Sequence, residues 1–175
     1  MRIVAGSCKG ARIVAPKGRG TRPTSDRVRE ALFQMLGPVE GMCVLDLYAG
    51  SGALGLEALS RGAASAVLVE SDRDAVHTIE RNVEKLGLAS ASVVRSDALR
   101  FLAAEDGTYD VVFVDPPYEM VESLGMPLAT HLPRVLAPAG VLVFETAAKV
   151  EPDLPLPVRA SRRYGSTRVT IFEAA

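Results

Sequence analysis

The chain has 175 residues, of which 48% are hydrophobic and 23% are charged, so we expect one folded domain with a substantial core and exclude a disordered chain. Its two cysteines, Cys8 and Cys43, form no CxxC pair, and we therefore expect neither a zinc site nor a disulfide scaffold, and no bound metal. No apolar run approaches the roughly 20 residues of a membrane span, and the N-terminus lacks the apolar stretch of a signal peptide. We expect a cytoplasmic protein that does not contact a membrane.

The net charge of −1 conceals an uneven distribution of basic residues. Residues 1–29 contain eight Lys and Arg against one acid, whereas residues 30–175 contain twelve against twenty, and a second basic cluster lies between Asp153 and Glu173. A cationic edge on an acidic body indicates a polyanionic partner, although an ordinary solvated arm has the same composition. The residues that we expect to contact such a partner are Arg2, Lys9, Arg12, Lys17, Arg19, Arg22, Arg162 and Arg163.

The N-terminal region is predicted to be a small extension. Two β-prone runs, residues 2–4 and 11–14, flank the turn sequence GSCKG and predict a β-hairpin. Residues 16–23 contain two glycines between two prolines and predict a linker. We therefore expect a basic hairpin and linker over residues 1–22, followed by the main domain over residues 23–175.

The main domain begins with a predicted helix, TSDRVREALFQMLG, which Thr24 or Ser25 caps and Gly37 ends. Strands and helices then alternate, and the sequence ends with two strands around Gly165. The expected strands are 42–47, 66–70, 91–95, 110–115 and 141–145, and the expected helices are 53–60, 72–86, 98–104 and a stretch interrupted by Pro127 and Pro133. This pattern predicts a doubly wound, mostly parallel, seven-stranded Rossmann-like sheet with an antiparallel C-terminal strand.

A glycine-rich loop is the first candidate site. Gly50, Gly52 and Gly55 have GxGxxG spacing between a predicted strand and a helix, and Glu70 ends the next strand. Glycines let a ligand approach the backbone closely, and an acid at the second strand can bind a ribose diol. The structural alternatives are a tight turn and a solvated strand end.

Asp46 identifies the ligand class that suits this loop. A dinucleotide would place its pyrophosphate near Asp46, and the carboxylate would repel it. The same carboxylate would attract an ammonium group, and S-adenosylmethionine carries an ammonium group, a ribose diol and no phosphate. Asp46 therefore favours S-adenosylmethionine as the cofactor, with a helix or turn cap as the structural alternative. At the end of the third strand, Asp97 and Ala98 are candidates to face the adenine, although Asp97 is equally a candidate helix cap.

The sequence DPPY, Asp115 to Tyr118, is the second candidate site and follows the fourth strand. Strand ends of a parallel sheet meet at one edge, so this run should face the cofactor. An exocyclic amine of a nucleobase is a poor nucleophile, and the Asp115 carboxylate and the Pro116 carbonyl are acceptors that would orient it. Pro116 and Pro117 would hold the acceptors rigidly, and Tyr118 would stack on the base. The alternative is a rigid turn in which Tyr118 packs locally.

These motifs resemble those of class I S-adenosylmethionine-dependent methyltransferases that act on exocyclic amines. Together with MRIVAG, TRPTSDRVREALF and RRYGSTRVTIFE, they resemble the bacterial 16S rRNA guanine-N2 methyltransferase family, often called the RsmD family. The resemblance implies a catalytic role for Asp115, Pro116, Pro117 and Tyr118. It implies cofactor binding by Asp46, Tyr48, Gly50, Gly52, Glu70, Asp97 and Ala98.

The resemblance further implies the methylation of one guanine N2 amine in the 16S rRNA of the small ribosomal subunit, by an enzyme that we expect to be a monomer. Phe is frequent in the family at the positions of Tyr48 and Tyr118, so the Tyr118 hydroxyl is not expected to be catalytic. A DNA adenine-N6 methyltransferase is the nearest alternative because DPPY occurs there too. A nicotinamide oxidoreductase would leave Asp46 and DPPY without roles, and a non-catalytic RNA-binding module is a further alternative.

Overall fold

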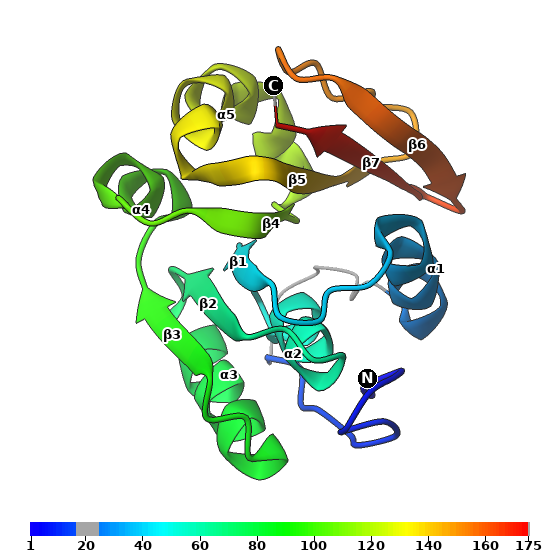
Figure 1. Ribbon diagram of the computed structural model, residues 1–175, viewed down its shortest axis with the longest axis vertical. Coiled ribbons are helices and arrows are strands. Elements are labelled where there is room, and N and C mark those ends of the chain that lie inside the picture. The colour runs from blue at the N-terminus through cyan, green and yellow to red at the C-terminus, as the bar shows by residue number, and fades with distance from the viewer. Residues whose placement is uncertain (17–24, 175) are drawn as a thin grey trace.

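The computed structural model describes residues 1–16 and 25–174. Within these residues seven strands form one sheet in the order β3-β2-β1-β4-β5-β7-β6 (Figure 1). The strands are β1 (Cys43–Leu47), β2 (Ser65–Glu70), β3 (Ala91–Arg95), β4 (Tyr109–Val114), β5 (Leu136–Ala147), β6 (Val158–Tyr164) and β7 (Thr167–Glu173). All neighbours pair in parallel except β7, which is antiparallel to β5 and β6. The predicted mostly parallel sheet with an antiparallel C-terminal strand is confirmed.

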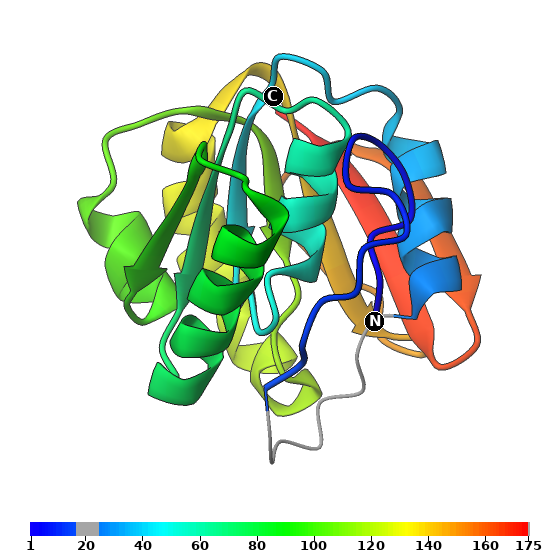
Figure 2. The ribbon, with the colours of Figure 1, turned by 90° about the horizontal axis from the view of Figure 1, so that it is seen from below.

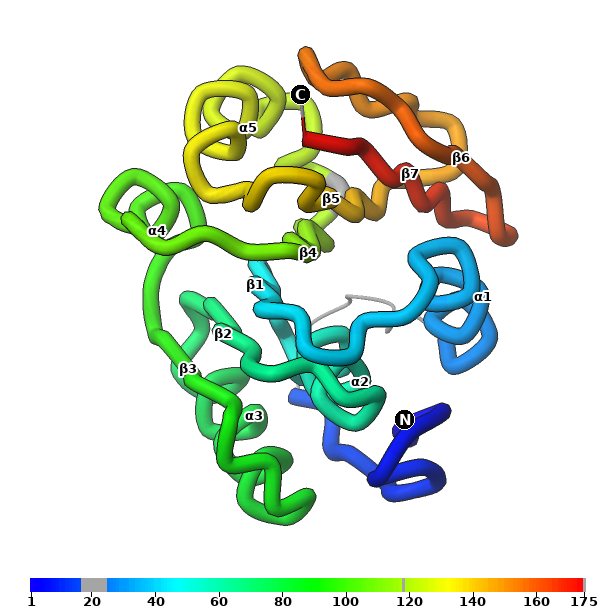
Figure 3. Tube along the Cα trace, viewed as in Figure 1, coloured from blue at the N-terminus to red at the C-terminus, as the bar shows by residue number. Residues whose placement is uncertain are grey.

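Helices cover both faces of the sheet (Figures 1 and 2). They are α1 (Asp26–Leu36), α2 (Ala53–Ser60), α3 (Arg73–Leu86), α4 (Ala98–Ala104) and α5 (Val121–Val135). The N-terminal segment, α1, α2 and α3 bury apolar side chains on one face, and α4 and α5 bury theirs on the other. Successive side chains of a strand point to opposite faces, so each central strand supplies both cores. The two chain ends lie on opposite faces (Figure 3).

The predicted helix boundaries follow from caps and from the spacing of apolar residues. Ser25 caps α1 by accepting a hydrogen bond from the Val28 N–H at 3.3 Å, as predicted, and Gly37 ends that helix. The expected interruption at Pro127 and Pro133 is wrong, because both prolines lie inside one continuous helix, α5. Its buried residues recur at helical spacing, and this burial outweighs the two missing N–H donors. They are Val121, Leu124, Leu128, Leu132 and Val135.

The predicted N-terminal β-hairpin is also wrong. Only an isolated antiparallel bridge joins Arg2 to Arg12, and the described residues 1–16 contain no strand. The Ile3 N–H donates to the Ala11 carbonyl and the Ile13 N–H to the Met1 carbonyl, but the Ala11 N–H donates to the Cys8 carbonyl within the turn and not back to Ile3. The N–H groups of Val4 and Val14 donate to Glu57 on α2 and to Asn82 on α3. The segment therefore closes its own turn and bonds to α2 and α3, and a single bridge stands in place of a hairpin ladder. The linker predicted at 16–23 falls almost entirely outside the described residues.

Glu57 is the centre of the contacts between the N-terminal segment, α1 and α2. Its side chain is fully buried, as is that of Arg29 on α1, and Arg29 Nε lies 3.5 Å from Glu57 Oε2. Arg61 Nε lies 2.8 Å from the other carboxylate oxygen, and the Arg61 guanidinium stacks over the Phe33 ring at 4.5 Å. Arg29 also contacts the Arg2 carbonyl and pairs with Asp26 at 2.9 Å. One buried carboxylate thus fixes three separate parts of the chain.

We expect Glu57→Gln to destabilise the protein by about 3–5 kcal/mol, because it removes the buried anionic partner of the Arg29 guanidinium and leaves only the partly exposed Asp26. Urea denaturation measures the change. Glu80→Gln is the matched control, since Glu80 pairs with His77 on the exposed surface of α3 and should contribute no more than about 1 kcal/mol. Equal losses for the two variants would contradict the role given to Glu57.

Candidate active site

The carboxyl ends of three adjacent strands bring the predicted site residues to one edge of the sheet. In the register of the central strand β1, Asp46 is paired with Phe113 of β4, and Leu47 is paired with Val69 of β2. Asp115 therefore follows β4 beside the end of β1, and Glu70 ends β2 on the other side. This is the edge at which open parallel sheets bind ligands.

The glycine loop that follows β1 has a left-handed backbone at three positions. The φ angles are 61° at Tyr48, 57° at Gly50 and 77° at Gly52, which is the residue before α2. A Cβ on Gly52 would lie 3.0 Å from a methyl group of Leu68, so this position has neither the conformational freedom nor the space for a side chain. Tyr48 is a bulky residue in a conformation that such residues rarely adopt, and strain of this kind is typical of functional sites.

Asp46 is buried, with 1% of its surface exposed, and one of its oxygens accepts a hydrogen bond from the Gly55 N–H at 2.9 Å. This contact matches the structural alternative of a turn cap for that oxygen, Oδ2. Burial raises the pKa of Asp46 to about 7 against the lowering effect of the Gly55 hydrogen bond, and repulsion from Asp115 and Glu70 adds to the rise. The two motif acids, Asp46 and Asp115, are therefore electrostatically coupled.

Glu70 holds the glycine loop against the end of β2. Its Oε2 accepts the Gly50 N–H at 3.0 Å, and its Oε1 accepts the Asp72 N–H at 2.8 Å. The side chain is partly exposed. Glu70 is thus fixed by backbone donors on both sides, at the position where the sequence predicts an acceptor for a ribose diol.

Asp97 caps α4, because its Oδ1 accepts the Arg100 N–H at 2.9 Å. Ala98 is buried at the start of that helix. The Tyr48 hydroxyl is also buried, and no hydrogen-bond partner for it exists among the described residues. Burial, with a contribution from the Asp97 carboxylate, raises the pKa of Tyr48 to about 12, so the hydroxyl remains protonated. A groove of about 520 Å³ lies between the end of β3 and α4, lined in part by Asp97 and Phe101.

The DPPY run forms a tight turn directly after β4. Asp115 is partly exposed, Pro116 is buried, and Tyr118 begins a short 3₁₀ helix, Tyr118–Met120. The Pro117 carbonyl accepts the Met120 N–H at 2.9 Å and closes this turn. The acceptor role of the Pro116 carbonyl and the stacking role of Tyr118 remain predictions.

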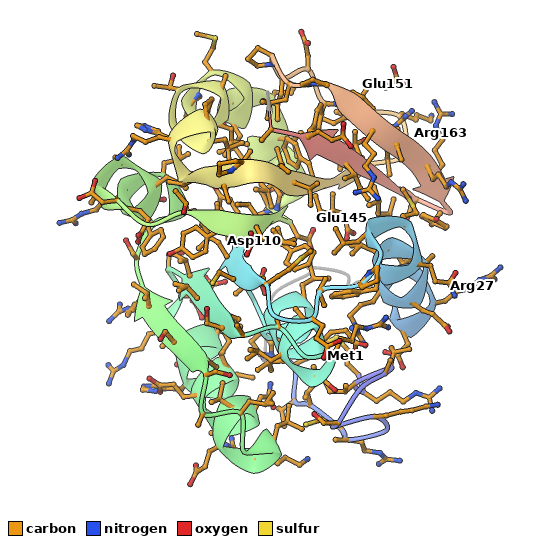
Figure 4. All side chains as sticks on the ribbon, in the orientation of Figure 1. Met1, Arg27, Asp110, Glu145, Glu151 and Arg163 are labelled. Atoms are coloured by element: carbon orange, nitrogen blue, oxygen red, sulfur yellow. The ribbon has the colours of Figure 1, made fainter. Side chains whose placement is uncertain are left out.

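The predicted RNA-contacting residues lie in two groups on either side of α1. Arg2, Lys9 and Arg12 are exposed in the N-terminal segment, and Arg162 and Arg163 are exposed on β6. Figure 4 places Arg163 and Arg27 on the same flank of the molecule. Some of these charges have acidic neighbours: Arg2 lies 3.2 Å from Asp26, and Arg163 lies 3.9 Å from Glu151. Lys17, Arg19 and Arg22 lie outside the described residues.

Asn82, which the sequence analysis does not single out, supports the glycine loop from α3. It is fully buried, and its Nδ2 donates to the Ser51 carbonyl within the loop at 3.0 Å. The signal in the sequence is an amide residue on the otherwise apolar face formed by Ala75, Val76 and Ile79. The same holds for Glu57, the one charged residue of α2, a helix whose residues are all buried.

The described residues contain neither a candidate metal centre nor a candidate membrane-spanning helix. Among residues 1–16 and 25–174, no group of three or more His, Cys, Asp or Glu side chains is arranged to hold a metal ion. In the same residues, no helix combines the length and the apolar character that crossing a membrane requires.

Comparisons with known proteins agree with this architecture. A family described as conserved hypothetical protein 95 matches residues 1–173. Ribosomal RNA small subunit methyltransferase D of Escherichia coli (strain K12) is 48% identical over 120 residues, which are 67% of this chain and 60% of that protein. YlbH of Bacillus subtilis (strain 168) is 38% identical over 183 residues and is matched over 99% of this chain and 98% of its own. The solved structure of yhhF from Escherichia coli has a TM-score of 0.86 and 35% identity, and the match covers 99% of this chain and 97% of that one.

We expect Asp46→Asn to remove a pH-dependent loss of stability. Because the pKa of Asp46 is raised from 3.8 to about 7, the folded chain keeps a proton that the unfolded chain releases, and the stability of the wild type falls as the pH rises through this interval. The variant keeps an oxygen for the Gly55 N–H but does not titrate. Urea denaturation between pH 4 and pH 8 should show that the variant gains stability relative to the wild type as the pH rises. Parallel pH profiles would contradict the assignment.

Proposed function

This chain belongs to the conserved hypothetical protein 95 family, the RsmD family of S-adenosylmethionine-dependent rRNA methyltransferases, and we propose that it methylates the exocyclic N2 amine of a guanine in 16S rRNA. The observation that carries the proposal is the position of Asp115, which follows β4 beside the end of β1, where Asp46 and the glycine loop lie. The name of the Escherichia coli relative, a small-subunit rRNA methyltransferase, supports the choice of substrate.

The residues of the glycine-loop edge fit S-adenosylmethionine, which when bound supplies an electrophilic methyl group on a sulfonium. Among the described residues the buried Tyr48 hydroxyl has no hydrogen-bond partner, as expected for a group that a ligand completes. The remaining oxygen of Asp46 would hold the ammonium group, Glu70 the ribose diol, and Asp97 and Ala98 the adenine side. Gly50 and Gly52 have no side chains, so the cofactor could approach the backbone of the loop closely at these two positions.

Asp115 is the proposed catalytic residue. Its partly exposed carboxylate would accept hydrogen bonds from the guanine amine, and this would direct the nitrogen lone pair towards the methyl group. Pro116 and Pro117 restrict the backbone next to Asp115 and so hold its carboxylate in place. The contribution of the chain to catalysis would therefore be largely the orientation of the amine towards the methyl group. Tyr118 would stack on the base.

A base must leave the RNA helix before its amine can reach Asp115. The basic groups of residues 1–22 and of β6 would hold phosphates on either side of the site while the rest of the chain, residues 23–175, binds the cofactor. We propose that the protein acts as a cytoplasmic monomer on the small ribosomal subunit or an assembly intermediate of it.

The test of the activity is a tritiated methyl-transfer assay with unmethylated small subunits, naked 16S rRNA and DNA. We expect label in 16S rRNA at a guanine N2, and label in DNA alone would favour the adenine-N6 alternative. Asp115→Ala should lower turnover at least about 100-fold, because the amine loses its orienting acceptor. Its affinity for S-adenosylhomocysteine, measured by calorimetry, should change little, since Asp115 is proposed to contact the substrate amine and not the cofactor. A large loss of cofactor affinity would place Asp115 in the cofactor site instead.

The RNA-binding role of the N-terminal segment is tested separately by Arg12→Glu. We expect weaker binding of 16S rRNA and a salt dependence whose slope is smaller by about one, because one phosphate contact is lost. Arg100→Glu is the matched control, since it makes the same change of charge at an exposed residue on α4, on the other face of the sheet. Filter binding over a salt series measures both variants, and equal effects would reduce the segment to an ordinary solvated arm.

A further inference from the structure

Asn82 joins the N-terminal segment to the glycine loop through one buried amide. Its Oδ1 accepts the Val14 N–H at 2.9 Å, and its Nδ2 donates to the Val14 carbonyl at 2.9 Å and to the Ser51 carbonyl at 3.0 Å. Only one orientation of the amide satisfies these contacts, because the reverse would turn its oxygen towards two carbonyl oxygens. The side chain is fully buried, so water does not compete for these bonds.

The two segments that Asn82 connects have different proposed ligands. Val14 lies two residues after Arg12, an exposed basic residue of the proposed RNA-binding segment. The Arg12 carbonyl accepts a hydrogen bond from Lys85 on α3 at 2.7 Å, which is a further attachment of this segment to α3. Ser51 lies between Gly50 and Gly52 of the proposed cofactor loop. Neither segment is a helix or a strand at these positions, so the amide supplies backbone partners that regular structure does not.

We infer that Asn82 is a positioning residue that couples RNA binding to cofactor binding. A ligand that orders one segment fixes the amide, and the fixed amide holds the other segment in its binding conformation. The second ligand then loses less conformational entropy when it binds, and the effect is equal in both directions. This inference rests on the proposed function and adds to it an order of events in which each ligand prepares the site of the other.

A second attachment of the N-terminal segment provides a matched control. Ser60 on α2 accepts the Cys8 N–H at 3.0 Å and donates to the Ala5 carbonyl at 2.6 Å. In the described residues these bonds hold the same segment without touching the glycine loop. Ser60→Ala should therefore loosen the segment while leaving the connection between Val14 and Ser51 intact.

The experiment measures the dissociation constant of S-adenosylhomocysteine by calorimetry, with and without saturating 16S rRNA transcribed in vitro. For the wild type we expect RNA to tighten cofactor binding at least about fivefold, and cofactor to tighten RNA binding by the same factor. Asn82→Asp keeps the acceptor for the Val14 N–H but loses the two hydrogen bonds that Nδ2 donates to the Val14 and Ser51 carbonyls. The factor by which RNA tightens cofactor binding should therefore fall towards one. Ser60→Ala should retain the factor of the wild type, and thermal unfolding checks that each variant is folded.

Hydrogen exchange on the wild type supplies a readout that needs no variant. S-adenosylhomocysteine alone should slow exchange of the Val14 amide, whose donor bond ends on Asn82. An unchanged Val14 amide, a wild-type coupling factor of one, or an equal loss of coupling in Ser60→Ala would each overturn this inference alone. A wild type that binds no S-adenosylhomocysteine would instead overturn the proposed function, and the inference with it.

Discussion

The candidate site depends on the parallel register of β1 with β2 and β4. Parallel pairing places strand ends side by side, so an acid near the end of β1 lies beside whatever follows β4 and whatever ends β2. Asp46, Asp115 and Glu70 become neighbours for this reason, although up to 69 residues separate them in the sequence. The mutual repulsion of the three acids contributes to the raised pKa of Asp46. A cationic ligand group placed among them would relieve this repulsion, whereas a phosphate would increase it.

Three buried polar side chains keep this edge in place by binding backbone groups. Asp46 accepts the Gly55 N–H, Glu57 accepts the Val4 and Ala5 N–H groups, and Asn82 binds both Val14 and Ser51. Each pays a desolvation cost that only complete hydrogen bonding offsets. Because the bonds of Glu57 and Asn82 join segments distant in sequence, they fix the N-terminal segment and the loop in place more specifically than apolar contacts can.

The sheet and most helix positions could be predicted because they depend on local patterns. Apolar runs, caps such as Ser25, and stops such as Gly37 are readable in short windows of sequence. The hairpin prediction failed because the Ala11 N–H bonds within the turn, and because the segment is held by Glu57 and Asn82, which lie more than 50 residues away in the sequence. Likewise, the sequence indicates that Asp46 and Asp97 place carboxylates at strand ends. Only the three-dimensional arrangement shows that one oxygen of each already accepts a hydrogen bond from a backbone N–H.

The hydrogen bonds that Asp46 and Asp97 accept from backbone N–H groups limit how each carboxylate can bind a ligand. A carboxylate that holds Gly55 or Arg100 with one oxygen has a single oxygen left for a ligand, so it can orient a donor group but cannot chelate one. Asp115 follows β4, precedes two prolines and is partly exposed, and it is the acid that we propose to meet the substrate. All three acids lie near strand ends, and Asp46 and Asp97 each accept an N–H from the first turn of the helix that follows.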